Sequence, residues 1–238
     1  MTTKERVNST RRTAIIVGVL FIIATVAGVL SVAFLGPVLA NPDYLINFAA
    51  NGNQIILGAL LDLVGAGAFV GLAIVIFPVL KNHNESIAIG YIVARSFEAV
   101  PFIVANLSLL SLLVLSQEYV GMSTPDAANF MPVGTGLRAT YDVAQLLGPR
   151  ILASLAALPF YTLLYRTKLL PRWMSVWGLL GAPLYFASGM LAMIGLVDPL
   201  SPILVFLFLP AALLEMVLAT WLILKGFNSS TFAASSAK

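Results

Sequence analysis

The sequence has no cysteine, one histidine and few charged residues, and each shortage excludes a class of protein. The absence of cysteine excludes disulfides, thiolate catalysis and iron–sulfur clusters. The single histidine, His83, lies between two apolar runs, so neither a bis-histidine haem nor a histidine-based zinc site is expected inside them. The sequence also lacks a Walker loop and a dinucleotide fingerprint. We therefore expect no cofactor and no metal site.

The shortage of charge indicates a chain that is solvated by lipid. Charged residues make up 10% of its 238 residues, whereas a soluble domain carries about 25%. The mean hydropathy is +0.98. Six windows reach the roughly 20 apolar residues that a transmembrane helix needs, and they lie at residues 14–35, 55–79, 87–115, 139–164, 173–196 and 203–224. The sequence predicts an all-α polytopic integral membrane bundle of six transmembrane helices.

The distribution of basic residues predicts that both termini are cytoplasmic. The first apolar window is about 22 residues long, more than the roughly 7–15 of a signal peptide, so we expect a retained span. Basic residues flank alternate ends of the windows, and the other connections are acidic apart from Arg138. This pattern accounts for the net charge of +3 without a nucleic-acid partner. We expect a cytoplasmic segment at 1–13, a membrane domain at 14–226 and a disordered cytoplasmic tail at 227–238.

Two outer connections carry signals for short interfacial structure. Asn41, Pro42 and Asp43 form a helix start signal, and Asn51 with Gly52 forms a stop, which predicts an interfacial helix at 42–50. Thr124-Pro125-Asp126 repeats the start signal before a Gly/Pro-rich stretch at 131–136. Ser201-Pro202 opens the last span in the same way.

Ionisable residues inside the predicted spans mark the candidate site, because they are costly in lipid and either pair or function. Arg95, Glu98, Arg150 and Glu215 fall near the middle of an approximately 30 Å core, and their charges sum to zero. Mutual neutralisation that fixes helix register and a polar binding cavity are both compatible with this balance. Asp62 and Asp142 lie nearer the outside.

Helical spacing places polar residues on one face of each of two successive spans. The first face carries Tyr91, Arg95, Glu98, Phe102 and Asn106, and the second carries Arg138, Tyr141, Asp142, Gln145 and Pro149. We expect Arg95 to pair with Glu215, with Glu98 as a titratable neighbour, and Asp62, Tyr141 and Asp142 to line an outward vestibule. The candidate intramembrane site comprises Asp62, Arg95, Glu98, Asn106, Tyr141, Asp142, Gln145, Arg150 and Glu215.

Several of these residues carry a resemblance to a known family. Arg95, Tyr141-Asp142, the run from Tyr165 to Pro171, and the closing run from Leu214-Glu215 through Trp221-Leu222 to Lys225-Gly226 resemble the bacterial multi-pass membrane proteins catalogued as domain of unknown function 4386. The likeness covers nearly the whole chain. It implies a bacterial inner-membrane protein without an established activity. Arg95, Tyr141, Asp142 and Glu215 match the family pattern, and Arg150 does not.

Three classes of function remain open at this point. The leading hypothesis is a membrane protein that binds or transports a small solute, a cation or a proton at the polar intramembrane site. An enzyme acting on a lipid or prenyl substrate is the second, although the sequence has no D-D-x-x-D cluster to hold a metal and a phosphate. The third is a scaffold whose buried charges are purely structural. We expect no catalytic residues, and the ligand and the oligomeric state stay open.

Overall fold

The computed structural model describes residues 3–121, 130–198 and 201–228 of the chain. Over these residues every regular element is a helix, and six helical segments are long and apolar enough to cross a membrane. They run Asn8–Leu39, Gly52–Lys81, Glu85–Val120, Phe130–Thr167, Arg172–Met193 and Pro202–Leu224. The predicted all-α six-span architecture is therefore confirmed. Helices are the expected solution, because backbone polar groups in lipid must be satisfied within their own segment.

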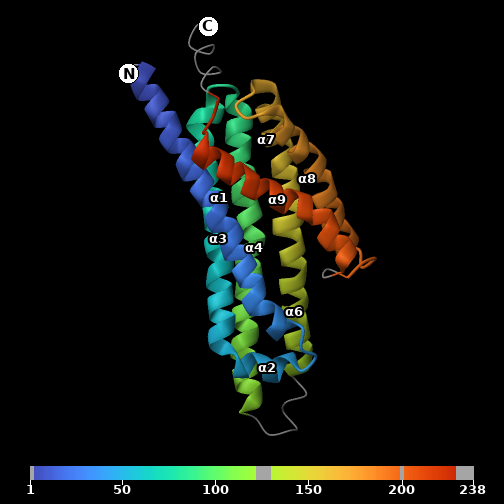
Figure 1. Ribbon diagram of the computed structural model, residues 1–238. Coiled ribbons are helices and arrows are strands. Elements are labelled where there is room, and N and C mark those ends of the chain that lie inside the picture. Colours follow the sequence, from blue (N-terminus) through green and yellow to red (C-terminus); the bar gives the residue numbers. More distant parts are fainter. Residues whose placement is uncertain (1–2, 122–129, 199–200, 229–238) are drawn as a thin grey trace.

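The helices follow one another with short connections (Figure 1). They are α1 (Thr3–Leu39), α2 (Tyr44–Ala50), α3 (Gly52–Lys81), α4 (Glu85–Val120), α6 (Phe130–Leu146), η1 (Leu147–Leu152), α7 (Ala153–Thr167), α8 (Arg172–Met193) and α9 (Pro202–Leu224). The fourth span combines α6, η1 and α7 without a break. Each predicted window lies largely inside one of these spans, and most of the helices extend beyond it.

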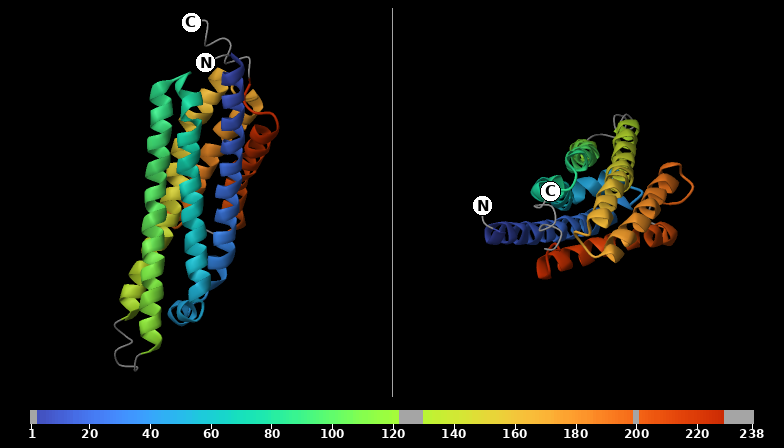
Figure 2. Two further views of the ribbon diagram at one scale, coloured as in Figure 1. Left: turned by 90° about the vertical axis from the view of Figure 1, so that its left-hand side faces the viewer. Right: turned by 90° about the horizontal axis from the view of Figure 1, so that it is seen from above.

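The long helices stand side by side, and α9 crosses them at an incline (Figures 1 and 2). The helix α1 packs against α3 and α9, while α4 packs against α3, α6 and α7. The helices α8 and α9 form a shorter hairpin. At about 1.5 Å per residue, the 36 residues of α4 measure roughly 54 Å, so this helix must tilt in or project beyond an approximately 30 Å core.

The two ends of the chain lie at the same end of the bundle (Figure 1). The guanidinium of Arg11 on α1 donates hydrogen bonds to the carbonyls of Leu222 and Ile223 near the end of α9. The backbone amide of Asn228 donates to the carbonyl of Leu169, between α7 and α8. An even number of spans requires this arrangement. Which side of the membrane these ends face stays a prediction from the positive charges.

The outer surface of the bundle is apolar, as a lipid-facing surface must be. Large apolar side chains lie exposed along it, among them Val29, Leu107 and Phe206 at 63%, 63% and 75% exposure. Several polar residues are instead buried, including Arg95 at 6% and Glu98 at 3% exposure. The polar groups therefore lie inside the helix bundle, where they contact one another rather than lipid.

The expected interfacial helix is present as α2, which begins at Tyr44 and ends before Asn51. Asp43 precedes it without a side-chain cap, and the carboxamide of Asn41 instead accepts from the Asp43 amide at 2.9 Å. The Gly/Pro-rich stretch at 131–136 is helical and belongs to α6. The start signal at 124–126 lies outside the described residues. Ser201 caps α9 as expected, accepting from the amide of Leu204.

The fourth span contains a π-helical turn, η1, that contains Pro149 and Arg150. Proline has no amide hydrogen and collides with the preceding turn, which is a common cause of such a bulge. Gly148 allows this turn to approach α4, because a Cβ at that position would meet the Glu98 carbonyl oxygen at 3.1 Å. The irregular turn therefore lies directly against the helix that carries Arg95 and Glu98.

Two residues of the segment expected to be a disordered tail make ordered contacts. Phe227 is buried with 8% exposure, and the side chain of Asn228 donates to the carbonyl of Lys168. The remainder of that segment, 229–238, lies outside the described residues.

Candidate functional site

A buried carboxylate on α3 is held by carboxamides from two other spans. Asp62 Oδ2 accepts hydrogen bonds from Asn106 Nδ2 of α4 at 2.9 Å and from Gln145 Nε2 of α6 at 2.8 Å. The hydroxyl of Tyr141, one turn before Gln145, lies 3.5 Å from the same Gln145 nitrogen. We call Asp62, Asn106, Tyr141 and Gln145 the Asp62 cluster. The two polar faces expected on successive spans thus meet at Asp62.

The Asp62 cluster contains a buried hydrogen-bond acceptor without a partner. Asp62 is 6% exposed and Asn106 is 2% exposed, and no ion pair to Asp62 exists among the residues that the structure describes. Asn106 Oδ1 is buried without a hydrogen-bond partner. The Asn106 amide already donates to Asp62 and to the Phe102 carbonyl. The Asp62 carboxyl and a carbonyl oxygen without a hydrogen-bond partner therefore lie on adjoining side chains.

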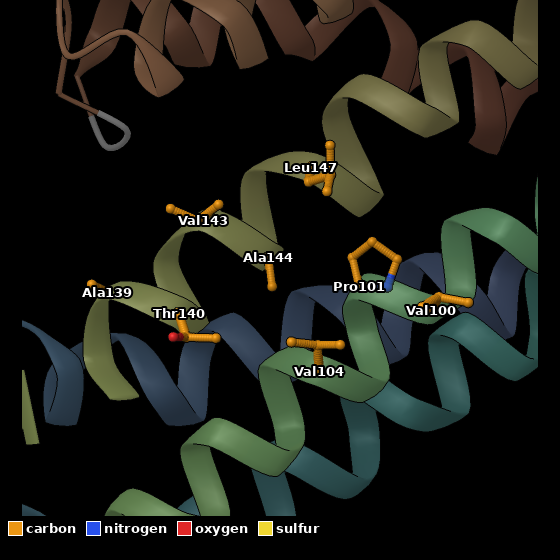
Figure 3. Close-up of a pocket in the computed structure, with 8 residues that line it drawn as sticks. All are labelled: Val100, Pro101, Val104, Ala139, Thr140, Val143, Ala144 and Leu147. Atoms are coloured by element: carbon orange, nitrogen blue, oxygen red, sulfur yellow. The ribbon is translucent and has the colours of Figure 1, made fainter. Parts of the chain in front are cut away.

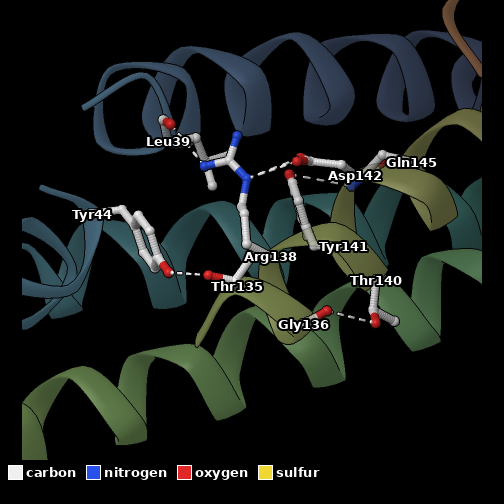
Figure 4. A network of polar contacts seen from close by, with 9 residues as sticks. All are labelled: Leu39, Tyr44, Thr135, Gly136, Arg138, Thr140, Tyr141, Asp142 and Gln145. Atoms are coloured by element: carbon white, nitrogen blue, oxygen red, sulfur yellow. Dashed lines mark hydrogen bonds and ion pairs between the residues drawn. The ribbon is translucent and has the colours of Figure 1, made fainter. Parts of the chain in front are cut away.

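The α6 helix carries a second, more exposed network near α2 (Figure 4). Arg138 Nε lies 2.9 Å from Asp142 Oδ2, and Arg138 NH1 donates to the carbonyl of Leu39 at 2.7 Å. The two charged side chains are 27% and 49% exposed. Tyr44 of α2 and Thr135 of α6 lie within hydrogen-bond distance, at 3.3 Å. Asp142 therefore belongs to the exposed rim of the bundle, although it directly follows Tyr141 of the Asp62 cluster.

A second buried polar cluster lies deeper, around Arg95 of α4. Arg95 NH1 donates to Glu98 Oε2 at 2.7 Å, and Arg95 Nε donates to the Tyr91 hydroxyl at 3.2 Å. The guanidinium lies 4.7 Å from the ring centroid of Phe69 on α3. Each of these partners stabilises a cation in a low-dielectric setting. The charge of Arg95 is thus compensated mainly within one turn of its own helix.

The expected ion pair between Arg95 and Glu215 is wrong. Glu215 Oε2 of α9 accepts a hydrogen bond from the Thr25 hydroxyl of α1 at 3.1 Å, and no ion pair to Glu215 exists among the described residues. Arg95 and Glu215 still interact electrostatically at longer range. Glu98 takes the place at Arg95 because it is three residues away on the same helical face, where an arginine reaches it without crossing the bundle.

The last residue of the predicted site is Arg150, and two further residues, Thr25 and Phe69, lie beside the buried charges. The guanidinium of Arg150 on η1 lies 5.9 Å from the ring centroid of Phe208 on α9. Thr25 and Phe69 contact the buried charges, and no pattern in the sequence singles out either residue. A threonine and a phenylalanine within apolar spans are ordinary residues there, so only their neighbours in space reveal their roles.

The two clusters stand at different levels of the membrane. On α3, Asp62 and Phe69 are seven residues apart, which is about 10 Å along the helix. On α4, Glu98 and Asn106 are eight residues apart, about 12 Å. The Arg138–Asp142 rim, the Asp62 cluster and the Arg95 cluster therefore form three successive polar levels, from one end of the bundle towards its middle.

A groove of about 470 Å³ opens between α4 and α6 on the other side of these helices (Figure 3). Its lining consists of Val100, Pro101, Val104, Ala139, Thr140, Val143, Ala144 and Leu147. The only hydroxyl among them, on Thr140, donates to the Gly136 carbonyl of its own helix. No polar group is left for a hydrophilic ligand, so this groove suits a lipid chain and is distinct from the polar clusters.

These features define a multi-pass helical membrane protein with buried polar clusters between its spans. The family model described as Domain of unknown function (DUF4386) matches residues 16–226, and the chain belongs to this family. The resemblance seen in the sequence is thereby confirmed. No curated protein and no solved structure matches the chain.

Proposed function

We propose that this membrane protein binds a proton or a monovalent alkali cation at the Asp62 cluster and moves it across the bilayer. The sequence left a small solute, a cation and a proton open as the ligand, and the Asp62 cluster favours the last two. The family resemblance adds the bacterial inner membrane as the proposed location.

The observation that carries the proposal is the buried Asp62 carboxyl, which has two amide donors and no basic partner among the described residues. A carboxylate in such a place is costly, because neutral donors recover only part of its lost hydration. Taking up a proton or a cation removes that cost. Asn106 Oδ1, which is buried without a hydrogen-bond partner, supplies a neighbouring acceptor for the proton or the cation.

The chemistry of the Asp62 cluster favours a monovalent occupant. The oxygens that could contact an occupant are those of the Asp62 carboxyl, the Asn106 carbonyl oxygen and the Tyr141 hydroxyl. Oxygen ligands select hard cations over soft ones. A single carboxylate balances one positive charge, whereas divalent sites in proteins usually have more acidic ligands.

Two further features support movement rather than static binding. Glu98 provides a carboxyl group about 12 Å from Asn106 along α4, and Glu215 on α9 interacts electrostatically with the Arg95–Glu98 pair. The π-helical turn η1 packs against α4 beside Glu98, and such turns are frequent at functional sites that change shape. The competing enzyme hypothesis gains no comparable support, since no group of three or more His, Cys, Asp or Glu side chains gathers among the described residues.

The test measures ligand-dependent stability of the purified protein in detergent. Melting temperatures are compared in sodium, potassium and choline chloride at equal ionic strength, and in choline chloride from pH 5 to pH 8. A ligand that binds only the folded state raises its melting temperature. We expect either an alkali ion or acidification to stabilise the native protein, and Asp62→Asn to lose most of that response.

Asp142→Asn is the matched control, because it removes the same charge from the exposed rim. It should keep the native response. A sodium-selective or potassium-selective shift identifies an alkali ion, and a shift with pH alone identifies a proton. A native protein indifferent to all of these conditions, or an Asp62→Asn variant with the full native response, would overturn the proposal. Flux in liposomes loaded with a pH-sensitive dye then tests movement with the same two variants.

A further inference from the structure

A second groove lies between α8 and α9, near the end of the bundle where the chain begins and ends. Its volume is about 380 Å³. Its lining is apolar along most of its length and comprises Trp173, Met174, Leu213, Met216, Val217, Thr220, Trp221, Leu224 and Lys225. It shares no residue with the Asp62 cluster or with the Arg95 cluster, so its role is independent of the proposed function.

One end of this groove is suited to a phosphate. Lys225 is exposed, and its ammonium lies 4.6 Å from the ring centroid of Trp221. No acidic side chain pairs with Lys225 among the described residues. Arg172, also exposed, directly precedes the groove residue Trp173. Tryptophans and basic residues of this kind occupy the headgroup level of a bilayer.

The rest of the groove is suited to a hydrocarbon chain. Leu213 and Lys225 are twelve residues apart on α9, which corresponds to about 18 Å along the helix. This length is close to one leaflet of an approximately 30 Å hydrocarbon core. The hydroxyl of Thr220 donates to the Met216 carbonyl, so it offers no free donor to a hydrophilic ligand.

We infer that this groove is a binding site for one anionic phospholipid, with its phosphate at Lys225 and Arg172 and an acyl chain between α8 and α9. Charge complementarity distinguishes it from the α4–α6 groove, whose lining carries no charge. If the positive charges set the orientation as predicted, the lipid belongs to the cytoplasmic leaflet.

The protein provides its own probe for this site. It contains three tryptophans, of which Trp173 and Trp221 line the groove, and the ring centroid of the third, Trp177, lies 6.2 Å from that of Trp173. Brominated acyl chains quench tryptophan fluorescence on contact. The protein is therefore reconstituted into phosphatidylcholine vesicles that contain a small fraction of brominated phosphatidylglycerol or, in parallel, of brominated phosphatidylcholine.

We expect brominated phosphatidylglycerol to quench more strongly at equal mole fraction, with a binding preference of about fivefold for each basic residue that contacts the headgroup. Lys225→Gln and Arg172→Gln should each reduce the preference, and the double variant should abolish it. Lys81→Gln is the matched control, since Lys81 is exposed at the same end of the bundle but lies on α3, in an ion pair with Glu85. Thr220→Phe, which fills the groove, should reduce quenching by both lipids.

Equal quenching of the native protein by the two brominated lipids would overturn the inference. A preference that survives in the Lys225→Gln, Arg172→Gln double variant would also overturn it, because the selectivity would then reside elsewhere. Melting temperatures of the variants, measured beside the fluorescence, show whether each is folded; the comparison of the two lipids on the native protein needs no variant.

Discussion

Arg95 and Glu98 form a buried ion pair within a single helical turn, with 2.7 Å between Arg95 NH1 and Glu98 Oε2 and with side chains 6% and 3% exposed. The pair lies on the face of α4 that contacts Phe69 of α3. Since the Tyr91 hydroxyl oxygen also accepts a hydrogen bond from Arg95 Nε, the cation is satisfied by its own helix. Glu215, across the bundle, is left with the Thr25 hydroxyl.

This pairing predicts which substitutions destabilise the bundle. Arg95→Leu and Glu98→Leu should each lower the free energy of unfolding by about 3–5 kcal/mol, because each leaves one buried charge without its partner. The Arg95→Leu, Glu98→Leu double variant should recover part of that loss. Glu98→Gln should cost less than Glu98→Leu, since its carbonyl oxygen still accepts from Arg95. Denaturant unfolding in detergent measures all four.

The control for this cycle pairs Arg95→Leu with Glu215→Leu. Since those two residues form no ion pair, their effects should add more nearly than those of Arg95 and Glu98. A larger coupling between Arg95 and Glu215 than between Arg95 and Glu98 would contradict the observed geometry.

The sequence predicted the spans and the polar faces of single helices because both depend on local periodicity. The spacing of Arg95 and Glu98, and of Tyr141 and Gln145, puts each pair on one helical face, whatever the rest of the chain does. The convergence of Asn106 and Gln145 on Asp62 depends instead on how three helices rotate against one another. Spacing within one helix contains no information about that rotation.

The partner of Glu215 shows the same limit. Charge balance suggested an arginine, and the structure supplies Thr25, a residue 190 positions away in sequence. Similarly, an irregularity at Pro149 follows from proline chemistry, but its form as a π-helical turn that contains Gly148 and packs against α4 does not. Proline removes one hydrogen bond, and the neighbouring helix decides how the backbone rearranges.

Close helix packing at Gly178 provides a second prediction. A Cβ at this position of α8 would overlap the ring of Tyr161 on α7, whereas a Cβ at Gly67 of α3 would meet nothing within 4 Å. Gly178→Ala should therefore lower the free energy of unfolding by about 1–3 kcal/mol, the usual cost of overpacking. Gly67→Ala should be neutral or slightly stabilising, because alanine favours helix. Equal effects of the two changes would show that Tyr161 moves aside freely.

The orientation of the bundle gives a third prediction. Cysteine introduced beside Lys81 or Lys168 should be labelled by an impermeant maleimide only after the cytoplasmic face is opened. Cysteine at Asp43 or Asp198 should be labelled in intact cells. The background is clean, because the chain has no cysteine of its own. We expect this orientation because lysine and arginine are concentrated at one end of the spans. Labelling of position 81 in intact cells would reverse the predicted orientation.

His83, in the connection between α3 and α4, predicts a pH dependence of stability. Burial lowers the pKa of His83 below its ordinary value of 6.5. The folded state therefore favours the neutral ring, and the corresponding stability is complete above pH 6.5 and is lost as the pH falls through the lower folded-state pKa. Unfolding measured between pH 5 and pH 8 should show that acidification shifts the stability of the native protein downward relative to that of His83→Gln, whatever the sign of the net change in each. If the free energies of unfolding of the two proteins followed parallel curves against pH, His83 would not contribute to the pH dependence.

The last prediction changes the charge of the Asp62 cluster while keeping its size. Asn106→Asp replaces the carboxamide that donates to Asp62 by a second carboxyl of nearly the same shape. Two carboxylates that share a buried site repel each other, and two positive charges are then needed for balance. We expect the variant to be less stable than the native protein in choline chloride, and to be stabilised by calcium more than by sodium. Calcium accepts oxygen-only ligand sets with two acidic groups.

Asn106→Leu separates this effect from the loss of the Asn106 hydrogen bond. It leaves Asp62 with one amide donor, from Gln145, and should cost about 1–3 kcal/mol without creating a response to calcium. Melting temperatures of the native protein and both variants, in choline, sodium and calcium chloride at equal ionic strength, decide the matter. A calcium response in Asn106→Asp alone shows that ligand selection follows the number of carboxyls at Asp62. Its absence, with the variant folded, would mean that a second carboxyl does not turn the Asp62 cluster into a divalent site, and the sodium and potassium responses of the native protein would then decide between an alkali ion and a proton.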